Sequence, residues 1–407
     1  MPMTVVTELE LPEFDYLAGD LTGEVYHRRL ADVRAEGWLA RSPLAVVVLD
    51  REAGEFFLRS RQTAFPGRQL AQFFGITDGR LWDHIDANIL NLSGAPHRHL
   101  RGLVGPAFTP RAADRWRPTM RDVLHRIGAD IDTAASCEFV ATVAKPYASL
   151  MIAAVLGAPE SDAPRLHEWS NWVQKQFDIQ ALAAERPMIE KALDEVYDYV
   201  AALLRDRRAH PADDLVSNLL AAEDAGERLS HNECVNLVLN VLAGGVDTTQ
   251  SQLAHGIRLF ADHPEQWALL AANPELAPKA VEEIVRMEPI TPFTARICTE
   301  DLEYRGVTFP ANTIVAICTE RANREPPAGE TFDITPDRDG RLLTFGAGAH
   351  YCLGANLARA ELEEALRFLA ERLPDLALDG PPKATGVEGI YGMQTLPIRW
   401  TPTNTAR

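Results

Sequence analysis

The sequence lacks the features that mark several common protein classes. Its five cysteines are scattered without a Cys-x-x-Cys pair, which excludes the usual zinc and iron–sulfur signatures and gives no disulfide framework. Positive charge is also scarce, because 40 lysines and arginines stand against 58 aspartates and glutamates, for a net charge of −18. This acidic balance argues against nucleic acid and against an anionic membrane surface as partners.

Long apolar runs and linkers are missing as well. The first 16 residues carry four acidic side chains and no stretch long enough for a signal peptide or membrane anchor. No Gly/Ser linker, low-complexity tract, internal repeat or glycine-rich dinucleotide fingerprint interrupts the 407 residues. We therefore expect a cytoplasmic protein whose cysteines, with one exception discussed next, are buried small residues in a reducing compartment.

The most informative stretch is a glycine-rich loop that meets a helical pattern at Cys352. Gly346 and Gly348 precede the cysteine, and Pro374 closes the helical run. The apolar residues of that run are Leu353, Leu357, Leu362, Leu366, Leu369 and Leu373. Cys352 is thus predicted at a helix N-terminus, where unpaired N–H groups and the helix dipole favour a thiolate. Such a thiolate can be a nucleophile, a structural thiol or an axial metal ligand.

The pattern Phe345-Gly-x-Gly-x-His350-x-Cys352-Leu-Gly354 resembles the haem-ligand loop of the cytochrome P450 family, and the resemblance extends from about residue 15 to residue 400. It implies that Cys352 is the proximal thiolate of haem b, with Phe345, Gly346 and Gly354 also at the cofactor. It also implies a mainly α fold with small β-sheets (α+β). Residues 1–407 would form one large helical domain, with the haem between a long distal helix and the helix after the cysteine.

A basic pair occurs on a helix that is predicted to start near Pro96. His97 and Arg101 are four residues apart and point the same way, which for an isolated pair indicates a solvated basic face. Together with the following Ala-Phe-Thr-Pro at 107–110, they resemble the family's helix that grips the haem propionates. Buried carboxylates need cationic or donor partners. By the same resemblance, Arg296 and His350 are further propionate contacts.

A long helix is predicted from the capping box Ser230-x-x-Glu233 to Pro264, about 32 residues or roughly 48 Å. Gly244 and Gly245 interrupt it at a cost of about 1–2 kcal/mol relative to alanine. Two uses explain them: close packing against a flat partner, or a bulge that opens backbone groups to a ligand.

The resemblance assigns this segment to the oxygen side of the haem, with Ala243 and Gly244 at the cofactor. Thr248 would then donate a hydrogen bond to bound dioxygen or to an ordered water, and Asp247 would relay protons from solvent. Alternatively, Thr248 bonds back to the carbonyl four residues earlier. Asn240, one turn before Gly244, either hydrogen-bonds the substrate or bonds within the helix.

The remaining substrate contacts come from two other segments. By resemblance, Thr291, Pro292 and Thr294 run beside the haem toward the pocket. The stretch from residue 389 to 393 resembles a hairpin tip that enters the substrate pocket, which adds Tyr391 and Met393. On the long helix, Ala243 and Gly244 are expected to line the pocket as well as the cofactor.

A buried ion pair is predicted at Glu283 and Arg286, which resemble the family's structural clamp. The family usually completes the clamp with an arginine just after Phe-Asp-Ile. Here Thr335 and Pro336 follow that tripeptide, so the sequence leaves the third member open, with Arg338 as a candidate.

The other elements are predicted from periodicity and turn residues. We expect helices over 24–37 and 52–59, a strand over 44–49 and a hairpin over 302–316. The segment 66–91 reads as an irregular loop, which in the family covers one side of the substrate pocket.

These features predict a monomeric haem-thiolate monooxygenase that uses O2 and two electrons to oxidise a small apolar organic molecule. Electrons would come from a ferredoxin and its NAD(P)H-dependent reductase. Docking candidates are Arg98, His99, Arg341 and Arg359, which are otherwise ordinary surface charges. Alternatives are a peroxide-driven hydroxylase, a nitric oxide reductase or a coupling oxidase of the same fold, and a non-catalytic haem sensor.

Overall fold

The computed structural model describes residues 4–131, 134–224, 229–325, 329–338 and 342–402. The chain divides into two compact units. The first unit holds residues 1–66, 282–352 and 384–392, and the second holds 67–281, 353–383 and 393–407. The prediction of one undivided domain stays a prediction.

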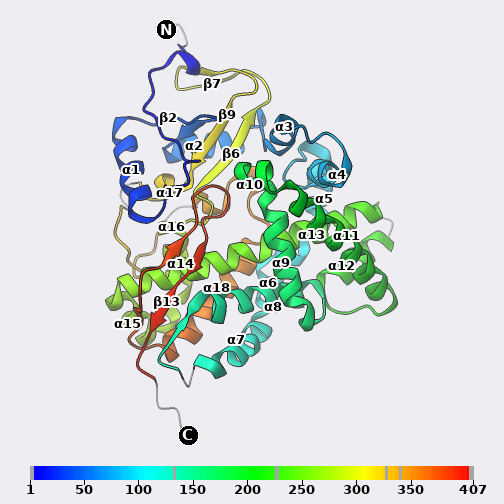
Figure 1. Ribbon diagram of the computed structural model, residues 1–407, viewed down its shortest axis with the longest axis vertical. Helices are drawn as coiled ribbons and strands as arrows, with labels where there is room; N and C mark the ends of the chain where they lie inside the picture. The colour runs from blue at the N-terminus through cyan, green and yellow to red at the C-terminus, as the bar shows by residue number, and fades with distance from the viewer. Residues whose placement is uncertain (1–3, 132–133, 225–228, 326–328, 339–341, 403–407) are drawn as a thin grey trace. The chain divides into compact units, whose positions relative to one another are not determined.

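The first unit is built on a five-stranded sheet in the order β2-β3-β9-β6-β4. Its strands are β2 (Leu39–Arg41), β3 (Val46–Val48), β9 (Ile314–Cys318), β6 (Phe293–Cys298) and β4 (Thr63–Ala64). The β3–β9 pair is parallel, whereas β2–β3, β9–β6 and β6–β4 are antiparallel. Figure 1 shows β6 and β9 running side by side at the centre of this sheet.

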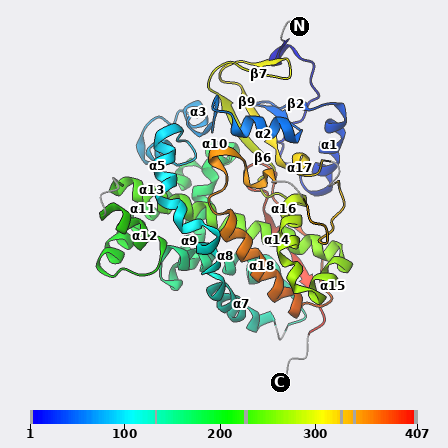
Figure 2. The same ribbon diagram turned by 180° about the vertical axis from the view of Figure 1, so that it is seen from behind.

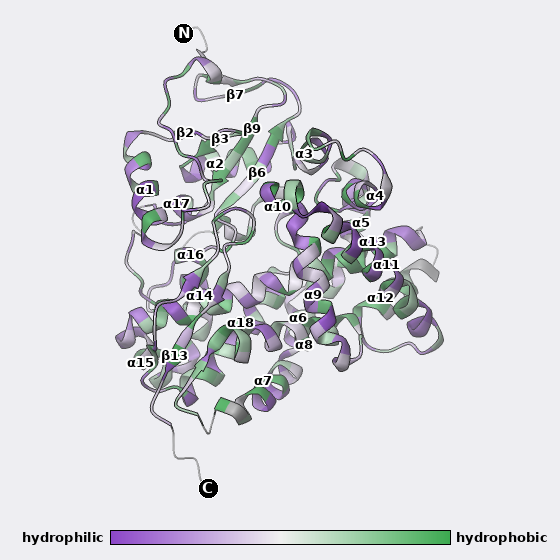
Figure 3. Ribbon diagram, in the orientation of Figure 1, coloured by the Kyte–Doolittle hydropathy of each residue, from purple (hydrophilic) through white to green (hydrophobic). Residues whose placement is uncertain are grey.

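Alternation along β3 and β9 gives this sheet two buried faces. Val46 and Val48 pack into one apolar cluster with Phe57 of α2 (Arg51–Arg59), whereas Val47 packs into another with Tyr26 of α1 (Gly23–Glu36). Successive side chains of a strand point to opposite faces, so a strand covered on both sides has to be apolar throughout. Both strands are accordingly hydrophobic along their length (Figure 3).

A second, three-stranded sheet in the first unit has the order β1-β8-β7, with β1 at Thr4–Val5. Strands β7 (Leu302–Tyr304) and β8 (Val307–Phe309) form the predicted hairpin. Arg305 and Gly306 connect them with φ of 49° and 76°, the left-handed conformation that a two-residue hairpin turn requires. The unit also contains α17 (Thr319–Asn323), and its border with the second unit falls within α16 (Ala277–Met287).

The second unit is mainly helical. Its core includes α8 (Lys145–Leu156), a helix that is apolar on nearly every side and is therefore buried, with Tyr147, Met151 and Ile152 inside. Helix α18 (Ala355–Arg372) lies beside α14 (Asp247–Asp262) and α7 (Arg117–Ile131), as Figure 2 shows. A small sheet of order β10-β13-β5 joins Ala377–Leu378, Pro397–Arg399 and Ser136–Glu138.

The remaining elements of this unit follow in chain order. They are α3 (Gly67–Phe73), α4 (Gly79–Ala87), α5 (Gly94–Val104), α6 (Pro110–Asp114), a π-helix (Val140–Ala144), α9 (Ala163–Gln174), α10 (Ile179–Ala184), α11 (Arg186–Ala209), α12 (Leu215–Asp224), α13 (His231–Gly245), α15 (Pro264–Ala272) and β12 (Met393–Thr395). Strand β11 spans Lys383–Ala384. None of the helices in the described ranges is both long and apolar enough to cross a membrane.

The predictions for the shorter elements hold with two corrections. The hairpin predicted over 302–316 ends at Phe309, because the next strand, β9, pairs with β3 and β6 in the five-stranded sheet. Helices α1 and α2 and strand β3 confirm the predictions over 24–37, 52–59 and 44–49. The prediction of an irregular loop over 66–91 is wrong, because this segment folds into α3 and α4. Glycines with positive φ at 75 and 79 separate two helices that are each too short to give a clear period, although Leu81 and Ile85 bury one stripe of α4.

The predicted clamp is present in the first unit and has a third member. Arg286 donates to both carboxylate oxygens of Glu283, at 2.7 and 2.8 Å. Arg338 donates to the same two oxygens, at 2.7 and 2.9 Å, and the backbone N–H of Asp333 adds a donor at 2.9 Å. Arg286 also donates to the carbonyls of Gly329 and Thr331. Arg338, the candidate from the sequence, therefore substitutes for the missing arginine.

Removing the shared carboxylate should be far more costly than removing one arginine. Glu283 and Arg286 are almost fully buried, with 2% and 1% of their side chains exposed, so Glu283→Gln leaves two guanidinium groups without their anion. We expect a loss of about 3–5 kcal/mol in the free energy of unfolding. Arg338→Gln leaves the Arg286–Glu283 pair intact and should cost about 1–3 kcal/mol.

The comparison is made by urea denaturation of the holoprotein followed by circular dichroism. The control is Arg126→Gln, which breaks the exposed Arg126–Glu160 pair and should cost less than about 1 kcal/mol. Similar midpoints for the Glu283 and Arg126 variants would contradict the clamp as a buried ionic network.

Candidate active site

The loop before Cys352 is held in shape by its glycines. Gly346 and Gly348 both have φ of 71°, a conformation that glycine adopts without strain. A Cβ atom at Gly348 would come within 2.9 Å of the Leu58 carbonyl oxygen, so this glycine also lets the loop pack against α2. The N–H of Cys352 donates to the Phe345 carbonyl at 2.8 Å, which closes the loop just before the cysteine.

Cys352 differs from the other thiols in its exposure. Cys352 is exposed and precedes the first residue of α18, Ala355, by three positions. Cys234, Cys298 and Cys318 are buried, and burial raises the pKa of Cys298 to about 11 and that of Cys318 to about 12. These two thiols stay protonated at neutral pH, so they are poor metal ligands. Within the described ranges, no group of three or more His, Cys, Asp or Glu side chains is placed to hold a metal ion.

Arg296 is a buried cation that meets no carboxylate partner in the described ranges of the chain. It lies in β6 with 4% of the residue exposed, and burial lowers the pKa of its guanidinium to about 10. Its one hydrogen bond in the described part of the chain is to the adjacent Ala295 carbonyl, at 2.8 Å. A buried charge without a counterion is costly. This position therefore suits an anionic group that is not part of the chain.

The predicted propionate helix is α5, where His97 and Arg101 lie one turn apart. His97 is buried, and burial together with Arg101 and Arg98 lowers the pKa of its imidazole. At neutral pH, His97 is therefore a neutral hydrogen-bonding group, and the charge of the pair resides on Arg101. His350, in the first unit, lies in the single turn Gly348–His350 and is half-buried.

The predicted long helix is divided at Val246. Ser230 and Glu233 form the predicted capping box, with contacts of 3.3 and 2.8 Å. Helix α13 ends at Gly245 and α14 begins at Asp247, since Val246 has φ of −94° and ψ of −69°. The prediction of one continuous helix is thus corrected to two helices that meet directly after the two glycines.

The two glycines at this division have different surroundings. A Cβ atom at Gly245 would lie 2.7 Å from the Ile152 side chain, so this glycine allows α13 to pack against α8. A Cβ atom at Gly244 would meet nothing within 4 Å, so this glycine faces open space. The Thr248 hydroxyl donates to the Gly244 carbonyl at 2.6 Å, which is the back-bonding alternative for this threonine. Ala243, just before the pair, is buried.

Asp247 faces a cluster of polar side chains on α9. In the orientation that satisfies its hydrogen bonds, the Asn171 side-chain nitrogen donates to the Asp247 carboxylate. Its oxygen accepts from His167 Nε2 at 2.8 Å. Burial raises the pKa of Asp247 to about 7, against the opposing effects of a Ser170 hydrogen bond and the Lys145 charge. Asp247 can thus hold a proton close to neutral pH. Burial lowers the pKa of His167 to about 4, which keeps that imidazole neutral.

A second buried carboxyl group contacts α14, the helix that begins at Asp247. Glu361 of α18 accepts a hydrogen bond from Thr249 at 2.9 Å, and its carbonyl accepts one from Tyr147 at 3.0 Å. Burial raises the pKa of Glu361 to about 8, although the Thr249 bond opposes this. The sequence analysis missed Glu361, Asn171 and His167. A signal existed for Glu361, which shares the inward face of its helix with Leu357 and Ala365.

The predicted substrate contacts are distributed between the two units. In the first unit, Tyr391 donates its N–H to the Ile290 carbonyl at 2.8 Å, next to Thr291 and Pro292, and its hydroxyl accepts from Gly23. Thr294 is half-buried in β6. In the second unit, Met393 is buried at the start of β12, and Asn240 donates to the Asn236 carbonyl at 2.5 Å. The within-helix alternative for Asn240 is therefore confirmed for its nitrogen.

The predicted docking residues fall into three groups. Arg98 and His99 are exposed on α5. Arg359 is half-buried on α18. Arg341 lies outside the described residues.

Comparison with known proteins identifies the family. Residues 38–372 match the family described as Cytochrome P450. The luteothin monooxygenase of Streptomyces thioluteus is 35% identical over 378 residues, covering 91% of this chain and 92% of that protein. The mycinamicin IV hydroxylase/epoxidase of Micromonospora griseorubida is 35% identical over 327 residues, covering 78% and 80%. The crystal structure of CalO2 superposes with a TM-score of 0.88 at 28% identity, covering 96% of this chain and all of that one. The chain belongs to the cytochrome P450 family of haem-thiolate monooxygenases.

Proposed function

We propose that this enzyme inserts one oxygen atom of O2 into a small apolar organic molecule, with two electrons supplied by a ferredoxin and its NAD(P)H-dependent reductase. The observation that carries this proposal is the acid–alcohol pair at the division of the distal helix. Asp247 has a pKa near neutrality and Thr248 follows it directly, beside the open face of Gly244. This pair favours reductive use of O2, which consumes protons, over a peroxide-driven reaction.

The residues of the chain fit a haem group. Cys352 offers an exposed thiol for the axial position, and the buried Arg296 offers a charge that lacks a counterion in the described structure. We propose that Arg296, Arg101, His97 and His350 bind the propionates. When bound, the haem supplies the oxygen chemistry, and a thiolate ligand favours O–O cleavage.

The proton path is the part of the reaction that the protein itself supplies. Asp247 can hold a proton at Oδ1 or Oδ2 at neutral pH because its pKa is raised to about 7. We propose that this proton passes to the Thr248 hydroxyl oxygen while the hydroxyl releases its own proton toward the open face of Gly244, so that its present donation to the Gly244 carbonyl is given up. Asn171 keeps the Asp247 side chain oriented toward α9 without adding a positive charge that would lower its pKa.

The first test concerns the axial ligand. Cys352→Ser should abolish the thiolate-type absorption of the reduced CO complex, because a hydroxyl cannot replace the thiolate. Cys137→Ser, at a half-buried thiol, serves as the control and should keep the native spectrum. A Cys352→Ser protein with the wild-type spectrum would remove Cys352 from the proposal.

The second test concerns the proton path. Thr248→Ala should bind haem and substrate normally but divert electrons to peroxide, whereas Thr248→Ser keeps the hydroxyl and should keep the coupling. Asp247→Asn should slow turnover by about a hundredfold or more, in line with the loss of a general acid.

The pH dependence follows from the raised pKa of Asp247. The protonated carboxyl is lost as the pH rises through about 7, so wild-type turnover should decline there, and Asp247→Asn should lose this step. NADH consumption and product formation with a surrogate ferredoxin pair give both quantities. Wild-type turnover and coupling in both the Asp247→Asn and the Thr248→Ala enzymes would exclude this pair from proton delivery.

A further inference from the structure

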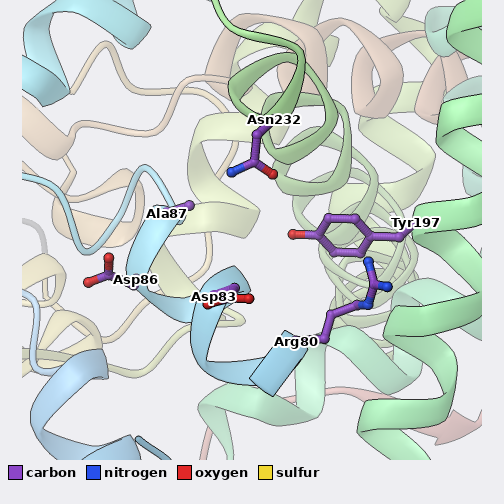
Figure 4. A pocket seen from close by; sticks show the side chains of 6 residues that line it. All are labelled: Arg80, Asp83, Asp86, Ala87, Tyr197 and Asn232. Carbon is purple, nitrogen blue, oxygen red and sulfur yellow. The ribbon is translucent and has the colours of Figure 1, made fainter. Parts of the chain in front are cut away.

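A row of amide side chains follows one face of α13. Asn232, Asn236 and Asn240 are four residues apart, and Gly244 continues the spacing. Residues four apart on an α-helix lie one above the other, about 6 Å apart along the axis. The row starts at a cavity of about 430 Å³, and Figure 4 shows Asn232 and Tyr197 at its border.

Asn236, the middle member, is fully occupied within the protein. It is buried, with 1% of the residue exposed. Its nitrogen donates to the Asn232 carbonyl at 2.9 Å, and its oxygen accepts from the Tyr197 hydroxyl at 2.7 Å. Both ends of this carboxamide are therefore committed, and Asn236 offers nothing to a ligand.

Asn240 is committed at one end only. Its nitrogen donates to the Asn236 carbonyl at 2.5 Å. Because a carbonyl oxygen can only accept, this contact fixes the orientation of the carboxamide and turns Oδ1 away from the helix backbone. Asn240 is half-buried, and no donor in the described part of the chain meets its Oδ1 atom. A polar atom in such a position is normally hydrogen-bonded.

The direction of the row connects Asn240 with the proposed site of oxidation. One turn after Asn240 lies Gly244, whose open face is next to the carbonyl that accepts from Thr248. A molecule lying along this face would therefore pass Asn240 Oδ1 about 6 Å before it reaches Gly244.

We propose that Asn240 selects substrates that carry a hydrogen-bond donor, an O–H or N–H group, about 6 Å along the helix from the part of the molecule beside Gly244. This inference rests on the proposed function and narrows its substrate class to apolar molecules with one such donor. An ether or a ketone of the same skeleton brings only acceptors, so it would leave two acceptors facing each other.

The test measures binding of matched alcohols and methyl ethers to the ferric holoenzyme. The probes are cyclododecanol and 1-adamantanol, each compared with its methyl ether, and the dissociation constants come from the low-spin to high-spin Soret shift. Wild-type enzyme should bind an alcohol about three- to tenfold more tightly than its ether, the value of one hydrogen bond. Asn240→Leu should bring the ratio close to one.

Two further variants separate specificity from folding. Asn240→Asp keeps acceptor oxygens and should keep the preference for alcohols. Asn232→Leu changes an exposed member of the same row and should keep the wild-type ratio. Equal affinities for alcohol and ether in the wild type, or an undiminished preference in Asn240→Leu, would overturn the inference.

The reduced CO spectrum of the same samples separates a failure of the proposed function from a failure of the proposed role of Asn240. A wild-type protein without the thiolate-type absorption contradicts the proposed function itself. A normal CO spectrum combined with equal affinities for both members of each pair overturns only the role of Asn240.

Discussion

An unpaired charge inside the protein is the constraint on which this account depends. Arg296 lies in the middle of β6 and is nearly fully buried, yet its hydrogen bond in the described chain is to a neighbouring carbonyl. Burying an isolated cation costs desolvation free energy, and such a cation is tolerated only where an anion offsets this cost. The clamp shows the usual solution within the same unit, where one buried carboxylate serves Arg286 and Arg338. Arg296 has no such partner among the residues that the structure describes, and we propose that its anion comes from a bound group.

The proposed oxygen side of the haem site depends instead on carboxyl groups that burial keeps protonated. Asp247 and Glu361 both have raised pKa values, and each is met by neutral hydrogen-bonding groups, Asn171 in one case and Thr249 in the other. Burial outweighs the opposing effect of the Lys145 charge, so the pKa of Asp247 is raised to about 7. Asn240 lies on α13 and Asp247 and Thr248 begin α14, so the residues proposed for substrate contact and for proton supply lie on either side of the division at Val246.

The sequence predicts those parts of the structure that depend on local chemistry. The capping box at Ser230, the Arg305–Gly306 turn and the loop before Cys352 follow from residue types at fixed spacing, and the structure contains each of them. Family resemblance adds the clamp, and Arg338, the candidate for its third member, takes that place. The short helices α3 and α4 are missed because each spans only two or three turns.

The contacts between segments that are distant along the chain could not be predicted from the sequence. His167 and Asn171 lie some 80 residues before Asp247, and Glu361 lies 112 residues after Thr249, so no periodicity relates them. The division of the distal helix was detectable as two glycines, but its physical basis required the contact of Gly245 with Ile152 of α8. The polarity of Asn240 was visible, whereas the orientation of its amide depended on the position of the Asn236 carbonyl.

The most direct test of the central claim is the affinity of the apoprotein for haem and for haem dimethyl ester, which lacks the propionate charges. The wild type should bind haem more tightly than the ester. Arg296→Leu should reduce this preference by about ten- to a hundredfold, the range for a hydrogen bond between charged groups, and Arg296→Lys should reduce it less. An Arg296→Leu protein that keeps the full wild-type preference would show that the buried guanidinium does not bind the propionates, and would contradict the account.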